Sequence, residues 1–294
     1  MKKIIVSFAA LVLFMACEKE IPLKQEESEP RIVVNAIFSA GDTIWINLSE
    51  SRDVLYDQML PNIENATAKL LDANDNVLAD FTHDTDGRYY CTDPMPVAGT
   101  TYGLRVEAAG FKTVTASAET PSIIALSSVD SSSTNSGEQY EFKLSFTDDA
   151  SQDNFYGISI VYHTYVEGGE PGEEFLSSNP YFSTKEFYVI NGEPDIDGTR
   201  YAMEFFFSDN GFNGQTINFT GRQYIWSSGE GDQFFVVGLK SLSEDLYKYK
   251  LSYSKYLDAQ GDFFAEPVQV YSNITDGFGI FGGSSTYRDT LWVE

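Results

Sequence analysis

The chain has 294 residues and a formal net charge of −25, with 44 acidic residues against 19 basic ones. A surface of that sign repels phosphate backbones and anionic lipid headgroups, which argues against nucleic-acid binding and against direct adsorption of the folded body on a membrane. The length is sufficient for one large or two ordinary domains with hydrophobic cores.

The N-terminus has the pattern of an export signal. Two lysines precede an apolar run over residues 4–15, which is too short to cross a bilayer as a mature helix and has the length of a secretory signal core. Ala16 and Cys17 end this run like a bacterial lipobox, in which the cysteine is acylated and becomes the mature N-terminus. We therefore expect residues 1–16 to be a signal peptide and Cys17 to carry the lipid. The alternatives are an ordinary signal peptide and a buried apolar strand.

Residues 17–30 are expected to form a lipidated flexible tether, because they are polar and charged and contain two prolines. The acidic residues after Cys17 resemble the signal that sends some lipoproteins of Bacteroidota to the cell surface. We therefore expect an outer-membrane location that faces outward. With Cys17 acylated, Cys91 has no partner for an intramolecular disulfide, and we expect it to be buried as a small apolar side chain.

From residue 31 the pattern predicts β-strands. Short alternating runs separated by turn residues occupy 31–121, and this spacing favours an N-terminal β-sandwich of immunoglobulin or fibronectin type. Ser39-Ala40-Gly41 predicts a hairpin between the first two runs, and residues 72–76 have the composition of a turn. The seven predicted strands are 32–38, 42–48, 66–71, 77–81, 88–91, 102–106 and 113–118.

Residues 122–294 are predicted to form a C-terminal β domain, so the fold class is all-β with two β-sandwich-like domains. A serine-rich stretch, 127–136, precedes its strands. The acidic segment 168–180 contains Gly and Pro and is expected to be a long, exposed loop, which on β scaffolds is commonly functional or disordered. The predicted strands are 140–146, 155–166, 187–190, 201–207, 216–219 and 234–239.

One amphipathic helix is predicted near residues 242–258. Ser243 is a suitable N-cap, two acidic residues follow it in the first turn, and Gly261 lies just past the end. We expect the apolar stripe of this helix to pack on the C-terminal domain. The stripe consists of Leu242, Leu246, Tyr249, Tyr253 and Tyr256.

Several short motifs match catalytic patterns in letters but not in context. Residues 277–282 spell G-x-G-x-x-G, yet residues 284–293 are predicted as a strand, whereas a dinucleotide site needs a helix there. We interpret these glycines as residues of a tight turn or of close strand packing. Ser252 and Lys255 match S-x-x-K without its companion motifs.

The remaining candidates for chemistry are also weak. His83 and His163 are the only histidines, and we expect them on turns or strand faces rather than in a triad or a zinc site. The Asp-Gly turns at 84–87 and 195–198 resemble calcium loops but lack the bidentate glutamate that an EF-hand requires. We therefore expect no catalytic residue, no metal and no cofactor.

The chain is rich in aromatic residues, which a large aromatic core explains in part. Adjacent aromatics lie on opposite faces of an extended chain, so one member of such a pair should face outward, where it could bind a protein or stack on a glycan. The candidate partner-binding residues are three acidic residues of the loop 168–180 and the adjacent aromatic pair at 181–182. These are Glu170, Glu173, Glu174, Tyr181 and Phe182.

The C-terminal residues resemble a known family. Residues 267–274 (PVQVYSNI) followed by 277–283 (GFGIFGG) resemble the C-terminal signature of the Bacteroidota lipoprotein family called domain of unknown function 4249, and residues 102–106 and 115–121 also fit. The resemblance implies an outer-membrane lipoprotein, often encoded near TonB-dependent transporters. It carries over no activity and no catalytic residues.

These observations predict a non-enzymatic lipoprotein that acts as an accessory or binding protein of a TonB-dependent transporter. The alternative is a carbohydrate- or peptide-binding module for nutrient capture, with aromatic side chains as stacking platforms. A hydrolase that uses carboxylates alone is less favoured, because it would need two carboxylates facing each other across a cleft.

Overall fold

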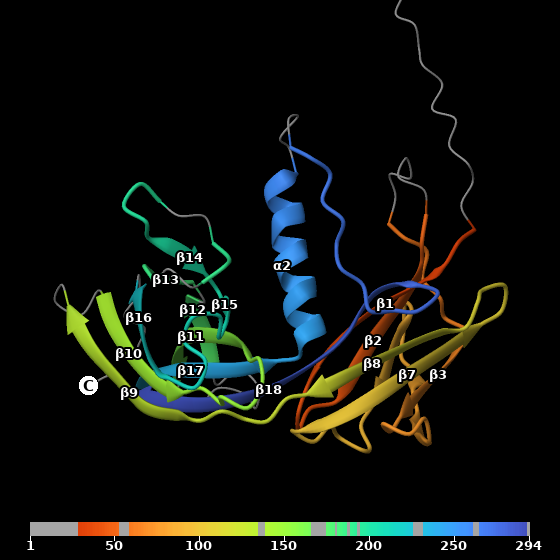
Figure 1. Ribbon diagram of the computed structural model, residues 1–294, viewed down its shortest axis with the longest axis horizontal. Helices are drawn as coiled ribbons and strands as arrows, with labels where there is room; N and C mark the ends of the chain where they lie inside the picture. Colours follow the sequence, from red (N-terminus) through yellow and green to blue (C-terminus); the bar gives the residue numbers. More distant parts are fainter. Residues whose placement is uncertain are drawn as a thin grey trace, which may run out of the picture.

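The computed structural model describes residues 29–52, 59–134, 139–165, 175–179, 181–186, 189–192, 195–225, 232–260 and 265–292. Strands dominate this part of the chain, together with helix α2 (Glu244–Ala259), as Figure 1 shows. The strands are β1 (Ile32–Ser39), β2 (Ile44–Glu50), β3 (Ala66–Leu71), β4 (Val77–Asp80), β5 (Thr82–His83), β6 (Arg88–Cys91), β7 (Thr100–Ala108), β8 (Val114–Thr120), β9 (Leu126–Thr134), β10 (Gln139–Thr147), β11 (Phe155–Tyr165), β12 (Phe175–Asn179), β13 (Phe182–Thr184), β14 (Arg200–Ala202), β15 (Phe205–Ser208), β16 (Thr216–Tyr224), β17 (Asp232–Leu242) and β18 (Phe278–Trp292).

The described strands form three sheets. The largest has nine strands in the order β12-β11-β17-β18-β1-β2-β6-β5, with β15 paired to β11. A five-stranded sheet has the order β14-β13-β16-β10-β9, and a four-stranded sheet has the order β4-β3-β7-β8. Most neighbours are antiparallel, whereas β1 and β18 run parallel.

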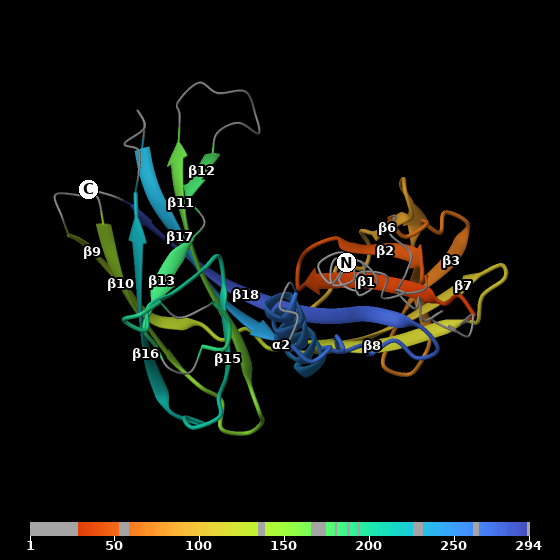
Figure 2. The same ribbon diagram turned by 90° about the horizontal axis from the view of Figure 1, so that it is seen from above.

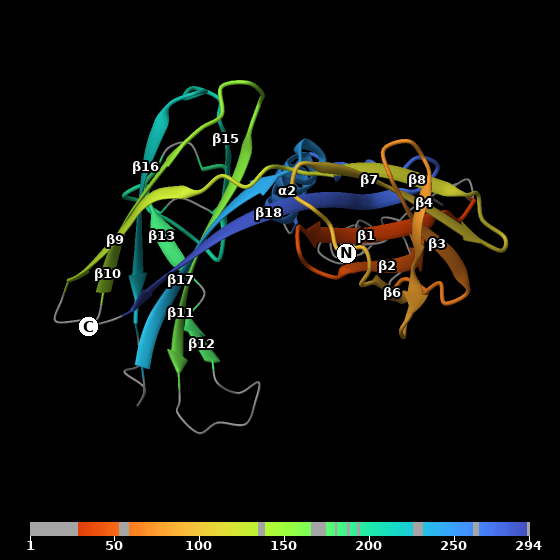
Figure 3. The ribbon, with the colours of Figure 1, turned by 90° about the horizontal axis from the view of Figure 1, so that it is seen from below.

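The three sheets build two sandwich-like halves. In the N-terminal half, β1, β2 and β6 pack on the four-stranded sheet around a core that includes Ile32, Leu104 and Phe281. In the C-terminal half, the outer layer of β9, β10 and β16 faces an inner layer of β11, β17 and β18, as Figure 3 shows. Its core is mostly aromatic and contains Phe142 and Tyr156. The prediction of an all-β, sandwich-like protein is confirmed.

Strand β18 connects the two halves. Its first part pairs with β1, with Phe278 opposite Val33, and its second part pairs with β17, with Trp292 opposite Phe234. Figure 2 shows this strand passing from one half into the other beside α2. One sheet therefore runs through both halves, and the division of the chain at residue 121 stays a prediction.

Two segments without predicted strand structure are in fact strands. The serine-rich stretch 127–136 lies largely in β9, which pairs with β10 along its length. Backbone hydrogen bonds hold this edge strand, so only Leu126 and Val129 need to supply apolar side chains. The predicted loop 168–180 contains β12, which pairs with β11.

The aromatic run 201–207 was predicted as one strand and forms two. Strand β14 joins the five-stranded sheet through β13, whereas β15 joins the nine-stranded sheet through β11. The chain therefore passes from one sheet to the other between β14 and β15, because the two strands pair with different partners. Val189 and Ile190, from the predicted strand 187–190, lie in no strand.

Helix α2 begins as predicted, but only Leu242 and Leu246 of its predicted apolar stripe are buried against the C-terminal half. The Ser243 hydroxyl accepts a hydrogen bond from the Leu246 N–H at 3.3 Å, which is the expected N-cap. Only the first turns contact the sheet, where Leu246 is buried and Tyr247 stacks on Phe155.

The later turns of α2 stand away from the sheet, as Figure 1 shows. Tyr253 and Tyr256 are therefore 43% and 37% exposed, and the tyrosine stripe stacks on itself rather than on the C-terminal core. Among the described residues, we find no helix with the length and apolar character needed to cross a bilayer.

Candidate ligand-binding pocket

The outer face of the five-stranded sheet is polar along β16 and β10, because these two strands alternate between inward and outward side chains. Along β16, Phe219, Gly221 and Gln223 point into the core. The intervening residues Thr220 and Arg222, with Tyr224 at the strand end, point outward. Strand β10 alternates in the same way and turns Gln139, Glu141 and Lys143 outward.

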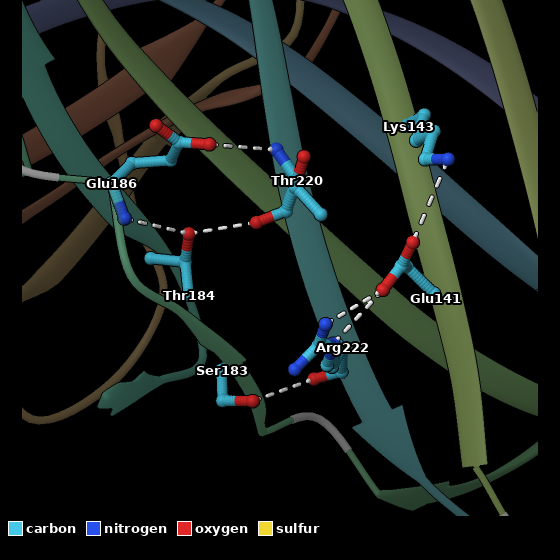
Figure 4. A network of polar contacts seen from close by, with 7 residues as sticks. All are labelled: Glu141, Lys143, Ser183, Thr184, Glu186, Thr220 and Arg222. Carbon is cyan, nitrogen blue, oxygen red and sulfur yellow. Dashed lines mark hydrogen bonds and ion pairs between the residues drawn. The ribbon is translucent and has the colours of Figure 1, made fainter. Parts of the chain in front are cut away.

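Strand register brings complementary outward side chains together. Glu141 lies directly opposite Arg222, and the Arg222 Nε and Nη2 atoms donate to Glu141 Oε2 at 3.0 and 2.8 Å. Lys143 Nζ lies 3.7 Å from the other oxygen of Glu141. Figure 4 shows this group beside β13. The guanidinium plane is thereby held in one orientation before any ligand arrives.

Side chains also attach the short strand β13 to β16. The Thr184 hydroxyl donates to the Thr220 carbonyl oxygen at 2.7 Å, and the Ser183 hydroxyl donates to that of Arg222 at 3.2 Å. In return, the Thr220 N–H donates to Glu186 Oε1 at 3.3 Å. These bonds, drawn in Figure 4, place the Glu186 carboxyl at the edge of the sheet.

A pocket of about 240 Å³ lies over this network. Tyr201 of β14 and Tyr224 of β16 line it and are 51% and 42% exposed. Lys185 and Asp197 add an ion pair of 2.8 Å. We call this site the Tyr201/Tyr224 pocket. Its lining residues are Gln139, Ser183, Thr184, Lys185, Glu186, Asp197, Thr199, Tyr201, Thr220, Arg222 and Tyr224.

The carboxyl groups around the pocket differ in their affinity for protons. The hydrogen bond from Lys185 lowers the pKa of Asp197, and that from Arg222 lowers the pKa of Glu141. Burial raises the pKa of Glu186 by more than the hydrogen bond from Thr220 lowers it. The pocket thus contains a well-ionised Asp197 and a Glu186 that accepts a proton more readily.

The two aromatic residues of the predicted partner-binding set differ in exposure. Tyr181 is 55% exposed, whereas Phe182 is 1% exposed and packs edge-on against Phe205 in the core. The prediction that one member of the pair faces outward is confirmed. Phe182 is the inward member, so its proposed contact with a partner is wrong. Glu170, Glu173 and Glu174 lie outside the described residues, as does Cys17.

Sequence reasoning missed the pocket residues Tyr201, Arg222 and Tyr224. A signal for two of them exists, because polar and core residues keep alternating after Phe219, where the predicted strand ended. The inward positions after Phe219 are occupied by Gly221 and Gln223. Because neither is a large apolar residue, the alternation is not visible in the sequence as a hydrophobic pattern. Nothing in the local sequence indicates that Tyr201 comes to the same face, because β14 reaches it through β13.

The other motifs have structural roles. Both histidines lie on strands, where His83 packs against Tyr89 and His163 stacks on Phe234. Gly277 and Gly279 lie where β18 closely approaches β1, Gly282 lies against Leu246 of α2, and strand rather than helix follows them. Within the described ranges, no three His, Cys, Asp or Glu side chains are grouped so that they could hold a metal ion.

The fold and the pocket define an all-β protein of two sandwich-like halves with a polar, tyrosine-rimmed pocket on one outer sheet. The chain belongs to the family described as Domain of unknown function (DUF4249), whose model matches residues 18–290. This confirms the resemblance seen in the C-terminal signature.

Comparisons beyond the family model are distant. No curated protein matches the sequence. The crystal structure of DIP-gamma IG1+IG2 is similar over 71% of this chain and 90% of that one, at 11% identity and a TM-score of 0.21. The structure described as manganese lipoxygenase of Gaeumannomyces graminis with partial zonadhesin of Komagataella pastoris is similar over 89% and 93%, at 10% identity and a TM-score of 0.23. The BSP domain of a biofilm associated protein is similar over 88% and 58%, at 9% identity and a TM-score of 0.16.

Proposed function

We propose that this protein is a non-enzymatic binding protein, anchored to the outer membrane by a lipid on Cys17, that works as an accessory of a TonB-dependent transporter. The sequence pattern of the first 17 residues supports the anchor, and the acidic residues after Cys17 support exposure at the cell surface. The chain belongs to the family described as Domain of unknown function (DUF4249), and the lipoprotein character that this resemblance implies supports the location.

The Tyr201/Tyr224 pocket is the observation that carries the binding function. Ligand sites combine a concave surface with a few fixed polar groups and aromatic walls, and this pocket has all three. Arg222 is held by two hydrogen bonds to Glu141, and Glu186 receives one from Thr220. Because these groups are already ordered, a ligand would lose little affinity to their immobilisation.

The accessory role depends on proximity. A lipid anchor holds the body close to a membrane-embedded partner and raises the effective concentration of each for the other. The contacts would come from the exposed side of the C-terminal half, where Tyr181 is accessible. Glu170, Glu173 and Glu174 are the proposed acidic contacts from the neighbouring segment of the sequence.

The pocket also favours a second candidate function, a carbohydrate- or peptide-binding module for nutrient capture. The two functions differ in their partner. An accessory protein forms a complex with its transporter, whereas a capture module holds a ligand without a stable protein partner.

Affinity purification of the full-length protein from detergent-solubilised outer membranes, followed by mass spectrometry, tests the proposal. We expect a TonB-dependent transporter to co-purify and its yield to fall for Tyr181→Ala and for the triple change of Glu170, Glu173 and Glu174 to Gln. Tyr256→Ala, which alters an exposed tyrosine on α2, is the matched control and should leave the yield unchanged. A retained glycan or peptide without any transporter would favour the capture module instead.

The proposal that the protein is not an enzyme is tested separately. The purified protein is incubated with whatever ligand it retains, and products are followed by mass spectrometry. We expect the ligand to stay intact. Turnover by the wild type that is lost in Glu186→Gln would contradict the proposal and assign the pocket to a hydrolase, because Glu186 is the pocket carboxyl whose pKa burial raises.

A further inference from the structure

The cationic side chains of the Tyr201/Tyr224 pocket are already neutralised by carboxylates. Two cations line it, Lys185 and Arg222, and each is bound by a carboxylate: Lys185 Nζ lies 2.8 Å from Asp197 Oδ2, and Arg222 donates twice to Glu141. A phosphate or carboxylate ligand would have to compete with these carboxylates for the cations, and Glu186 on the same surface would repel it. An anionic ligand is therefore disfavoured.

The lining is equally unsuited to a purely apolar ligand. The lining mixes donors and acceptors: the guanidinium of Arg222 on β16, the amide of Gln139 on the neighbouring β10, and the carboxyl of Glu186 just after β13. A carboxyl or amide oxygen accepts hydrogen bonds, while a guanidinium only donates them. A ligand that suits this mixture must carry several groups that both donate and accept, and a hydroxyl group does both.

The aromatic rim adds a second requirement. Strand β13 lies between β14 and β16, so the strands that carry Tyr201 and Tyr224 are roughly 10 Å apart given the usual strand spacing. Register places Tyr201 opposite Ser183, which in turn lies opposite Arg222, and Tyr224 is two residues further along the same face. Both tyrosines therefore lie on the face that carries Arg222, with Tyr201 across β13 from it and Tyr224 next to it along β16. Exposed tyrosine rings present flat apolar faces beside polar hydroxyls, which suits a ligand with C–H faces and hydroxyl edges.

Neutral sugars combine these two properties, because each pyranose ring has C–H groups on its faces and hydroxyls around its edge. We propose that the Tyr201/Tyr224 pocket binds a neutral oligosaccharide, with sugar rings against the two tyrosines and hydroxyls directed to Arg222, Glu186 and Gln139. This inference rests on the proposed binding function and names its ligand class. A peptide is the competing ligand. Its terminal carboxylate would meet cations already bound by Asp197 and Glu141, so only its ammonium group would find an unneutralised partner, Glu186.

The test uses the full-length protein in a detergent without a sugar headgroup, because a maltoside detergent would occupy the site. A neutral glycan array selects the probe, and titration calorimetry with the best neutral glycan, a tripeptide mixture and inorganic phosphate follows. We expect only the neutral glycan to bind, with an affinity that changes little between ~50 and ~500 mM salt, because no net charge is neutralised. Tyr201→Ala and Tyr224→Ala should each weaken binding about tenfold, through loss of ring stacking.

Tyr256→Ala is the matched control, since Tyr256 is an exposed tyrosine on α2 that does not line the pocket, and it should bind the glycan like the wild type. The inference is overturned if no array glycan binds, if Tyr201→Ala and Tyr224→Ala bind as tightly as the control, or if phosphate or peptide binds in the pocket instead. If a peptide binds and Tyr201→Ala abolishes that binding, the neutral oligosaccharide is contradicted as the ligand, while the proposed binding function of the pocket is supported. Loss of transporter co-purification with intact glycan binding would remove only the accessory role.

Discussion

The side-chain amide of Asn273 and the backbone of Phe281 exchange two hydrogen bonds: Nδ2 donates to the Phe281 carbonyl oxygen at 2.8 Å, and the Phe281 N–H donates to Oδ1 at 3.0 Å. The same Nδ2 atom lies 3.2 Å from the Ser117 carbonyl oxygen in β8 and 3.3 Å from Asp245 Oδ2 in α2. Asn273 therefore ties the segment before β18 to both halves. The family signature around it has an architectural role.

Replacing Asn273 with Ala should lower the free energy of unfolding by about 2–3 kcal/mol, because the backbone groups of Phe281 lose their partner. Urea denaturation measures the change. Asn218→Ala is the control, since exposed Asn218 receives one hydrogen bond, from the Ser145 hydroxyl, and should cost less than about 1 kcal/mol. Equal losses in the two variants would contradict the role assigned to Asn273.

Gly279 should tolerate no side chain. Its φ is +104°, and a Cβ atom there would collide with the carbonyl oxygen of Val34, its partner in the parallel pair of β1 and β18. We expect Gly279→Ala to destabilise the protein by more than about 3 kcal/mol, the combined cost of an unfavourable φ and a displaced strand.

Gly110→Ala separates these two costs, because Gly110 has a φ of +87° but nothing within 4 Å of the position that a Cβ atom would take. It should lose only about 1 kcal/mol. Thermal melts of both variants give the comparison. If Gly279→Ala and Gly110→Ala have the same melting temperature, the close approach of β18 to β1 is not what excludes a side chain at position 279.

Glu186 should make stability fall as the pH rises through the weakly acidic range. Its pKa in the unfolded chain is near 4.5, and burial raises the folded value. Between the two values, the folded state holds a proton that the unfolded state has lost, so its contribution is complete below pH 4.5 and decreases as the pH rises. Glu186→Gln should lack this decrease, which denaturation at a series of pH values would reveal.

Glu141 should behave in the opposite way. The hydrogen bond from Arg222 lowers its folded pKa below 4.5, so its contribution is present above that pH and is lost as the pH falls through the folded pKa. The same denaturation series applied to Glu141→Gln should show less acid sensitivity than the wild type. Parallel pH profiles for Glu141→Gln and Glu186→Gln would disprove the opposed environments of the two carboxyls.

Replacing Cys17 with Ala should release the protein from the membrane, because the thiol to be acylated is gone. Detergent phase partitioning detects the change. Cys91→Ala provides the control, since Cys91 is buried in the N-terminal core and should leave partitioning unaltered. A Cys17→Ala protein that still enters the detergent phase would show that the anchor lies elsewhere.

Local pattern was sufficient for much of the fold. Alternation along residues 44–48 predicted β2, because one face of a strand must be buried and the other solvated. The Ser243 cap predicted the start of α2, because an exposed N-terminal N–H needs a nearby acceptor. The positive φ of Gly41 agrees with the predicted hairpin after β1.

The candidate site was less predictable, because its residues come from separate strands. Alternation correctly assigned opposite faces to Tyr181 and Phe182, but it could not say which of them entered the core. The side chains that line the pocket gather only through the strand order β14-β13-β16-β10. Local sequence does not specify that order, since the backbone N–H and C=O groups of a strand can pair with those of any other strand.

By itself, the sequence determined most of the segments that become strands, where α2 begins and how polar the outer faces are, because these depend on neighbours within a few residues. The tertiary structure alone decided that β18 lies beside β1, where the Ser284 hydroxyl donates to the Phe38 carbonyl oxygen across 246 positions of the chain. That pairing depends on the burial of β18 side chains in both cores, with Phe281 in the N-terminal core and Leu291 against the C-terminal one. It also decided that Tyr201 and Tyr224 flank one pocket, because each reaches that face only through the strands paired between them.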